Sequence, residues 1–408
     1  MFIKLFKEIN IYSNLFEKNE NDREINIYKL KDCIATGYNL YYPNILFKTD
    51  DSDLILPLLE RTMSLNSGTI YEKSDMSYNY QEKSMTEECN EPLFFFVYNT
   101  DNYYHFIYDS LPYLITYCEL KKSIPNIKLL MQYPNPQKSE FYRFVIEFLN
   151  ILAIYNEDII LINDYTQYKE IYISTSYTHD KNSNSPPRKE IFDFYHKIVK
   201  IVREKHLIET PKKIYISRRT WLHNDFSNIG TNYTTRRKLV NEDELVEYLI
   251  SNGYKEVFTE NLTTIEKILY FANATDVVGA IGGGISNVVF SPKATKLVAI
   301  ISPTFLDVNA RFQFCLENVE VQYYTNTQHT ENSEFKTYMR IRSNDGKILG
   351  EIEKIYDNKL LVSYSDSLNT GWNAQSIYKQ IELDCNDVKK IDDGLNSPWK
   401  ISNIFDII

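Results

Sequence analysis

The chain has 408 residues, 43 % of them hydrophobic, which predicts about two or three domains with apolar cores. The formal net charge of −10 excludes a general nucleic-acid-binding protein, because such proteins carry a basic footprint. The five cysteines never occur in C-x-x-C spacing, no apolar run reaches about 18 residues, and the first residues are charged too early for a signal peptide. We therefore expect a cytoplasmic protein without a disulfide framework, a zinc site or a membrane-spanning helix.

Residues 1–205 are predicted to form a first α/β domain. In its first 90 residues we expect a strand at Ile25–Leu30, a short helix at Leu54–Met63 and an exposed loop over 72–90. Strands and helices then alternate, with strands at Leu93–Tyr98, Ile127–Met131, Ile159–Ile162 and Glu170–Ser174, and helices at Tyr103–Leu120, Phe141–Leu152 and Lys189–His206.

Two polar residues lie on the opening turns of the predicted helix 103–120. His105 and Asp109 are four residues apart, so they share one face of that helix. They follow a buried strand, which is where α/β proteins place ligand sites. Two interpretations stay open at this point: a functional pair, and an ordinary helix pair at the surface.

Residues 206–325 are predicted to form a second α/β domain with a parallel, doubly wound sheet. Strands are expected at Lys213–Ser217, Glu256–Thr259, Val277–Ile281 and Lys296–Ile301. The helices between them begin at two predicted capping boxes, Asn241–Glu244 (with Val240 and Leu245 as a hydrophobic staple) and Thr263–Glu266.

Three consecutive glycines, Gly282, Gly283 and Gly284, follow the third of these strands. Without Cβ atoms the turn lets a ligand approach the backbone, and a helix beginning at Ile285 would present its N–H groups there. Ser286 and Asn287 lie on the first turn of that helix. The alternative is a tight turn that holds no ligand.

Basic residues gather between Lys212 and Lys238, where Asp225 is the only acid. Arg218 stands at the carboxyl end of the first strand, the edge of such a sheet that binds ligands. Guanidinium groups suit phosphate oxygens, so we expect a phosphate or diphosphate site; the alternative is a basic loop without a fixed ligand. The glycines do not form the G-x-G-x-x-G fingerprint of dinucleotide sites.

Residues 326–408 are predicted to form a small β-rich module of about SH3 size. Apolar residues alternate over Thr337–Arg342, Lys347–Ile355 and Leu360–Tyr364, and hairpin turns are expected at Asn344–Gly346 and Asp357–Asn358. This module is expected to mediate oligomerisation or to bind a partner.

Four segments together resemble glycosyltransferase family 61. They read N-Y-Y-H-F-I-Y-D-S-L-P (102–112), Y-I-S-R-R (215–219), R-R-K-L-V-N-E-D-E-L (236–245) and F-A-N-A-T-D-V-V-G-A-I-G-G-G-I-S-N-V-V-F (271–290). The resemblance covers roughly residues 92–305 and implies a GT-B architecture, in which two Rossmann-like domains face each other across a cleft. It also implies inverting transfer from a nucleotide sugar, such as a UDP-sugar, to a hydroxyl of a glycan or protein, with no metal cofactor. The D-x-D spacing at Asp51–Asp53, used by metal-dependent sugar transferases, lies in an acidic run and is interpreted as a solvated loop.

The resemblance assigns hypothetical roles to individual residues. Asp109 is expected to be the catalytic base, oriented by His105, and Arg218 is expected to bind the diphosphate together with the N–H groups of the glycine turn. Further donor contacts are expected from Arg219, Arg237, Lys238, Ser286 and Asn287, and Glu260 is expected to bind a ribose hydroxyl.

One position departs from the family pattern, which usually has His in G-x-H-G-A-G where this chain has Ile281. This departure leaves open a catalytically impaired protein that uses the fold to bind a glycan or a partner. Another GT-B enzyme, such as a nucleotide-sugar epimerase, is a third alternative.

Overall fold

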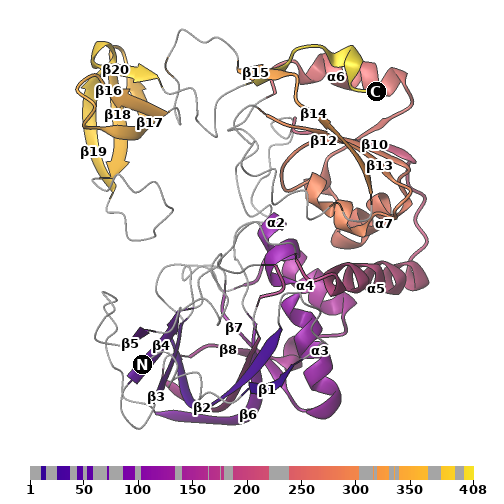
Figure 1. Ribbon diagram of the computed structural model, residues 1–408, viewed down its shortest axis with the longest axis vertical. Helices are drawn as coiled ribbons and strands as arrows, with labels where there is room; N and C mark the ends of the chain where they lie inside the picture. The colour runs from indigo at the N-terminus through magenta and orange to yellow at the C-terminus, as the bar shows by residue number, and fades with distance from the viewer. Residues whose placement is uncertain are drawn as a thin grey trace. The chain divides into compact units, whose positions relative to one another are not determined.

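A computed structural model describes residues 11–14, 25–36, 44–48, 53–57, 71–72, 86–96, 103–133, 140–163, 165–174, 176–178, 187–219, 239–302, 316, 319–329, 335, 340–365, 378–390 and 399–408. The chain divides into two compact units, whose elements are labelled in Figure 1. The first unit comprises Met1–Ile208 and Thr263–Ala272, and the second comprises Glu209–Leu262 and Asn273–Ile408.

A nine-stranded mixed sheet forms the centre of the first unit. Its strands are β1 (Ile11–Asn14), β2 (Asn26–Thr36), β3 (Asn44–Lys48), β4 (Asp53–Pro57), β5 (Tyr71–Glu72), β6 (Glu87–Phe95), β7 (Lys128–Met131), β8 (Ile159–Leu161) and β9 (Thr166–Ser174). The order is β5-β4-β3-β2-β9-β6-β7-β8, with β1 on β2. Strands β9, β6, β7 and β8 are parallel to one another, whereas β2 to β5 form an antiparallel meander.

The parallel strands of this sheet confirm the predicted alternation of strands and helices. The antiparallel strands show where the prediction for the first 90 residues was wrong. Leu93 to Phe96 are each at most 2 % exposed, as expected for a strand covered on both faces. The predicted helix at Leu54–Met63 is wrong at its start, because Asp53–Pro57 is strand β4 paired with β3; residues 58–63 lie outside the described residues. The predicted loop over 72–90 is also wrong at its end, since β6 begins at Glu87.

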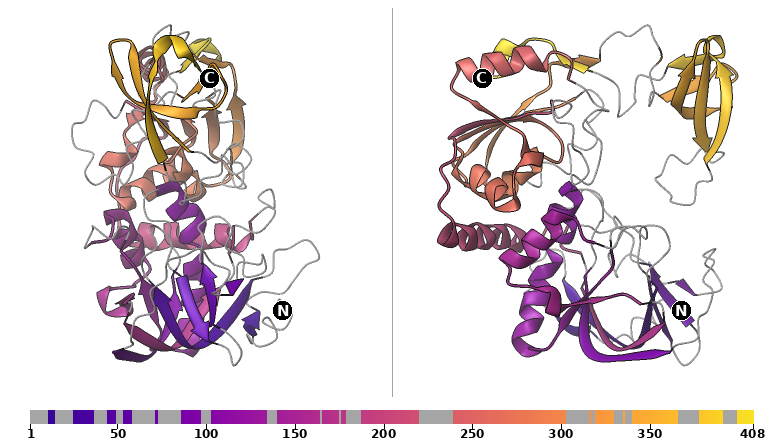
Figure 2. Two further views of the ribbon diagram at one scale, coloured as in Figure 1. Left: turned by 90° about the vertical axis from the view of Figure 1, so that its left-hand side faces the viewer. Right: turned by 180° about the vertical axis from the view of Figure 1, so that it is seen from behind.

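Helices gather on one side of the first unit's sheet in Figures 1 and 2. They are α2 (Tyr103–His105), the π-helical turn η3 (Phe106–Ser110), α3 (Tyr113–Ser123), α4 (Arg143–Ile151) and α5 (Glu190–Lys205). A further helix, α7 (Thr264–Asn273), follows later in the chain. The capping box of α7 is confirmed, because Glu266 N–H donates to Thr263 Oγ1 and Thr263 N–H donates to Glu266 Oε2, at 3.2 and 2.7 Å.

The second unit contains a parallel sheet, as predicted, with five strands where the sequence indicated four. Its strands are β10 (Lys213–Ile216), β11 (Lys255–Val257), β12 (Asp276–Ala280), β13 (Lys296–Ile300) and β14 (Glu320–Tyr324). The spatial order β11-β10-β12-β13-β14 places the second strand outside the first and the third on its other side. The winding direction therefore reverses between β10 and β12, which is the topological switch point of a doubly wound fold.

Helix α6 (Glu242–Ser251) packs on this sheet through Leu245, Val246 and Leu249. The predicted capping box at its start is wrong. Asn241 precedes the helix but makes no side-chain cap; its amide instead bonds the main chain of Ile401, donating to O at 2.9 Å and accepting from N–H at 3.1 Å.

A separate antiparallel sheet confirms the predicted β-rich region. Its strands β16 (Arg340–Ser343), β17 (Leu349–Tyr356), β18 (Lys359–Ser365), β19 (Tyr378–Asp384) and β20 (Val388–Lys390) enclose a small core of their own (gold in Figure 2). Gly346 and Asp357 have positive φ angles of 75° and 44° in its hairpin turns.

The C-terminal residues pack with the parallel sheet and not with this module. Strand β21 (Trp399–Ile401) pairs with β15 (Thr327–His329), and Trp399, which is 1 % exposed, shares a core with Tyr215 and Val278. The predicted module over 326–408 therefore includes residues that complete the second unit's core. None of the helices described here is long and apolar enough to cross a membrane.

Candidate functional site

The switch point of the second unit brings the predicted anion-binding residues to one edge of the sheet. Strand β10 ends at Ile216 and leads into Ser217 and Arg218, while the neighbouring strand β12 ends at Ala280 and leads into the glycine turn. Because parallel strands end at the same edge, both segments border the crevice where doubly wound folds bind ligands.

Arg218 lies directly against the glycine turn. A Cβ atom placed on Gly282 would be 3.1 Å from Nη1 of Arg218, so the guanidinium occupies the space that a side chain would take. Among the described residues, the buried Nε of Arg218 has no hydrogen-bond partner. Burial lowers the pKa of Arg218, and the charges of Glu242 and Glu260 oppose that shift. A cation in this position, with a buried donor unused, is suited to hold an anion.

The three glycines have different surroundings. A Cβ on Gly284 would lie 2.9 Å from both Ile216 Cγ2 and Thr259 Oγ1, whereas a Cβ on Gly283 would meet nothing within 4 Å. Gly284 therefore permits close packing of the turn on the end of β10. The following helix, η8 (Ile285–Phe290), is a 3-10 helix and not the expected α-helix.

Ser286 and Asn287 are fully buried and bind the turn itself. Ser286 Oγ donates to the carbonyl of Gly283 at 2.6 Å, and Asn287 Nδ2 donates to the carbonyl of Gly284 at 2.8 Å. These bonds fix the shape of the turn. Ile281 is also buried, and its N–H donates to Ile300 O at 3.0 Å, so the side chain at this position joins the core.

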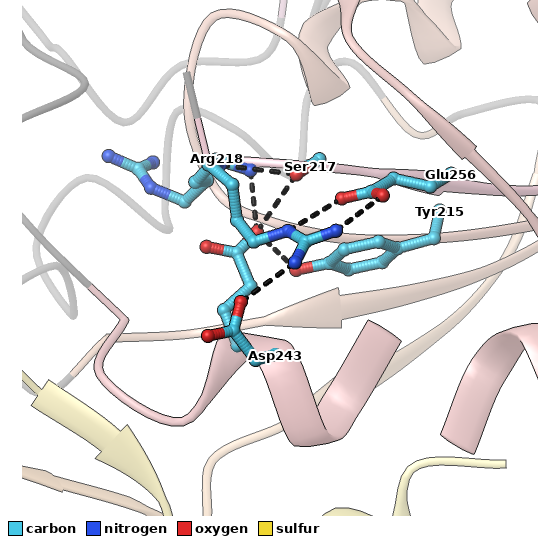
Figure 3. Close-up of polar contacts among 7 residues, drawn as sticks. Tyr215, Ser217, Arg218, Asp243 and Glu256 are labelled. Atoms are coloured by element: carbon cyan, nitrogen blue, oxygen red, sulfur yellow. Dashed lines mark hydrogen bonds and ion pairs between the residues drawn. The ribbon is translucent and has the colours of Figure 1, made fainter. Parts of the chain in front are cut away.

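Arg219, next to Arg218, is engaged within the protein. Its guanidinium donates to both carboxylate oxygens of Glu256, at 2.9 and 2.6 Å, and to Asp243 at 2.7 Å. The bond with Glu256 is the main reason that the pKa of Arg219 is raised. In Figure 3 the guanidinium of Arg218 points away from this group of contacts. The two neighbouring arginines thus differ: Arg219 joins β11, through Glu256, to α6, through Asp243, whereas Arg218 lies at the switch point.

Sequence reasoning missed Glu242, which is 1 % exposed at the start of α6. Its Oε1 accepts hydrogen bonds from Tyr215 Oη at 2.8 Å, Ser217 Oγ at 3.3 Å and the backbone N–H of Arg218 at 2.6 Å. Burial raises the pKa of Glu242, although these bonds oppose the shift. The signals in the sequence were its place in the first helical turn, where acids are ordinarily exposed, and in the segment 236–245 that resembles the family.

In the first unit, His105 and Asp109 form a buried pair, which excludes the surface-pair interpretation. They are 9 % and 5 % exposed, and His105 Nδ1 lies 2.5 Å from Asp109 Oδ2. The π-helical turn η3 carries Asp109 and ends with Leu111 N–H bonded to Phe106 O at 2.7 Å. Turns of this kind are frequent at functional sites. The carboxylate can orient the imidazole ring.

The remaining predicted residues are placed as follows. Glu260 lies on the short helix η7 (Thr259–Asn261), close enough for its charge to act on Arg218. Arg237 and Lys238 lie outside the described residues, as does Asp51. Within the described residues, no cluster of three or more His, Cys, Asp or Glu side chains could hold a metal ion.

Residues 103–298 match the family model of Glycosyltransferase 61, a range that contains His105, Asp109, Arg218 and the glycine turn. No curated protein matches the chain.

Proposed function

The chain carries a glycosyltransferase family 61 domain over residues 103–298, and from this premise we propose that it transfers a sugar from a nucleoside-diphosphate sugar to a hydroxyl of a glycan or protein. The proposed reaction inverts the anomeric centre. The acceptor oxygen forms a bond to C1 of the sugar, the bond from C1 to the diphosphate breaks, and the nucleoside diphosphate leaves with the electron pair. A base in the protein takes the acceptor's proton.

The observation that carries this proposal is the contact between Arg218 and Gly282 at the switch point. There a diphosphate can approach the backbone of the turn while the guanidinium binds its oxygens bidentately. Negative charge grows on the diphosphate as the bond to the sugar breaks, so Arg218 stabilises the transition state more than the ground state. We assign Glu260, whose charge acts on Arg218, to a ribose hydroxyl of the same donor.

We assign the base to the His105–Asp109 pair of the first unit, and we propose that the enzyme is of the GT-B type. Nδ1 of His105 and Oδ2 of Asp109 engage each other. Asp109 is the assigned base, and His105 is assigned to orient it. Burial of the pair favours proton transfer to a positioned group over exchange with water.

Two substitutions test the two halves of the proposal. R218A is expected to weaken UDP binding by about tenfold or more in calorimetry, since a charge-assisted hydrogen bond is lost. D109N is expected to leave UDP affinity unchanged and to lower transfer by about a hundredfold or more. Unchanged UDP affinity in R218A would remove Arg218 from the donor site, and unchanged turnover in D109N would exclude Asp109 as the base.

A second candidate function is favoured by Ile281. A buried aliphatic side chain at the position where the family usually has His is consistent with a protein that binds a donor or a glycan without transferring sugar. Donor hydrolysis without an acceptor separates the two candidates: an active transferase releases nucleoside diphosphate slowly, and an inactive binding protein releases none.

A further inference from the structure

The carboxylate of Glu242 has no part in the proposed chemistry, yet it is one of the most buried acids among the described residues. Burying a carboxylate is costly unless hydrogen bonds compensate for lost water. All three donors that reach it belong to the short segment Tyr215–Arg218 at the end of β10. The Glu242 carboxylate on α6 therefore binds the end of β10 that carries Arg218.

The backbone after β10 needs these hydrogen bonds because it leaves the sheet after Ser217. Ser217 N–H still donates to Val257 O of the neighbouring strand segment, at 3.0 Å. The next N–H, that of Arg218, points out of the ladder and donates to Glu242 at 2.6 Å. The following residue, Arg219, is held by Glu256 and Asp243. The backbone is thus fixed on both sides of Arg218, and Glu242 supplies the bond at Arg218 itself.

We propose that Glu242 is a positioning residue for the donor site, which sets the backbone of Arg218 so that its guanidinium lies against Gly282. This inference rests on the proposed function, in which Arg218 binds the diphosphate. The carboxylate acts through the length of its side chain, which lets it accept hydrogen bonds from Tyr215 on β10 and from Ser217 and Arg218 just after it. A ligand oxygen must meet the guanidinium within hydrogen-bond distance, so a displaced backbone costs affinity although Arg218 is still present.

Two conservative variants separate the effect of side-chain length from the effect of charge. E242Q keeps the length of the side chain and an acceptor oxygen but removes the charge, whereas E242D keeps the charge and shortens the side chain by one methylene. E244Q and E244D are matched controls, because Glu244 is exposed and lies in the same first turn of α6. UDP is titrated into each purified full-length variant by calorimetry, and thermal unfolding confirms that each variant is folded.

We expect E242D to bind UDP about tenfold more weakly than E244D, because the shortened acid no longer reaches the N–H of Arg218. We expect E242Q to stay within about threefold of E244Q, because its amide oxygen accepts the same bonds. Equal UDP affinity in E242D and E244D would overturn the proposal. A tenfold loss in E242Q would overturn it as well, because charge and not side-chain length would then be the cause.

The double variant E242D/R218A shows whether Glu242 acts through Arg218. If it does, E242D has no further effect once Arg218 is absent, so the double variant binds UDP as weakly as R218A. An undiminished tenfold loss on the R218A background would assign Glu242 only a general structural role. The single variant R218A reports on the proposed donor site by itself. If R218A loses affinity and E242D does not, only this inference fails; if R218A keeps its affinity, the proposed site fails.

Discussion

The three consecutive glycines are expected to respond differently to the same substitution. In G284A, the new Cβ would lie 2.9 Å from Ile216 Cγ2 and from Thr259 Oγ1, whereas ordinary contacts begin at 3.4 Å. Backbone strain does not contribute, because Gly284 has φ −64° and ψ −48°, which any residue adopts. The cost is therefore one of overpacking against the end of β10, about 1–3 kcal/mol of unfolding free energy.

The two neighbouring glycines provide matched controls. In G283A the Cβ meets nothing within 4 Å, so stability is expected to stay the same or rise slightly, by at most about 1 kcal/mol. In G282A the Cβ lies 3.1 Å from Nη1 of Arg218, the movable end of a side chain, which can yield. G282A is therefore expected to leave stability almost unchanged and to weaken UDP binding by about tenfold.

Thermal unfolding and UDP titration of the three variants give the test. G284A is expected to lower the melting temperature by about 3–10 °C, G283A to keep at least the wild-type melting temperature, and G282A to keep the melting temperature while UDP affinity falls. Equal melting temperatures for G284A and G283A would refute the packing argument. Wild-type UDP affinity in G282A would show that the guanidinium does not need its place beside the turn.

Three further predictions concern stability. E147Q should destabilise the first unit at neutral pH. Burial alone would raise the pKa of Glu147, but hydrogen bonds from the Thr264 N–H and from Arg143 outweigh it and lower the pKa. The ionised carboxylate therefore stabilises the fold above the pKa that Glu147 has in the unfolded chain, and this stabilisation is lost as the pH falls through the pKa of the folded state. A difference in melting temperature that does not shrink as the pH is lowered below the ordinary Glu pKa of about 4.3 would contradict this. T263A should cost about 1 kcal/mol in thermal unfolding through loss of the capping box, and an unchanged melting temperature would exclude that role. Replacing residues 330–398 by Asn-Gly should leave UDP affinity intact, because His329 and Trp399 are paired in an antiparallel ribbon that a two-residue turn can close; an aggregated product would show that the module is needed for folding.

The sequence predicted the second unit's parallel sheet well, because each of its signals is local. Apolar runs define β10, β12 and β13, and glycines end β12. The nearness of Arg218 to the glycine turn could also be predicted, since parallel strands end at one edge. The sequence could not reveal that Arg218 is unpaired at its Nε while Arg219 is paired with Glu256, because Glu256 lies on another strand.

The first 90 residues were harder to predict, because their strands pair with partners that are distant in the sequence. Strand β2 pairs with β9, so Ile27 lies beside Ser174. The π-helical turn at Phe106–Ser110 could not be predicted from the sequence either, because His105 and Asp109 would share a face in an ordinary α-helix as they do here. Burial of that pair, which decides between a functional and a surface interpretation, comes from the aromatic side chains packed around it, such as Tyr104 and Tyr108.

The failed capping box at Asn241 has a physical explanation that extends to the donor site. A local signal places the Asn241 side chain on the N–H groups of its own helix, but Ile401 offers it both a donor and an acceptor from an edge strand. Leu239 pairs with Trp399 in an isolated bridge, so the segment entering α6 is held by residues near the C-terminus. Glu242, the residue after Asn241, accepts a hydrogen bond from the backbone N–H of Arg218. The C-terminal residues thus stabilise the start of the helix that positions the arginine, an arrangement that tertiary packing produces and that no local pattern records.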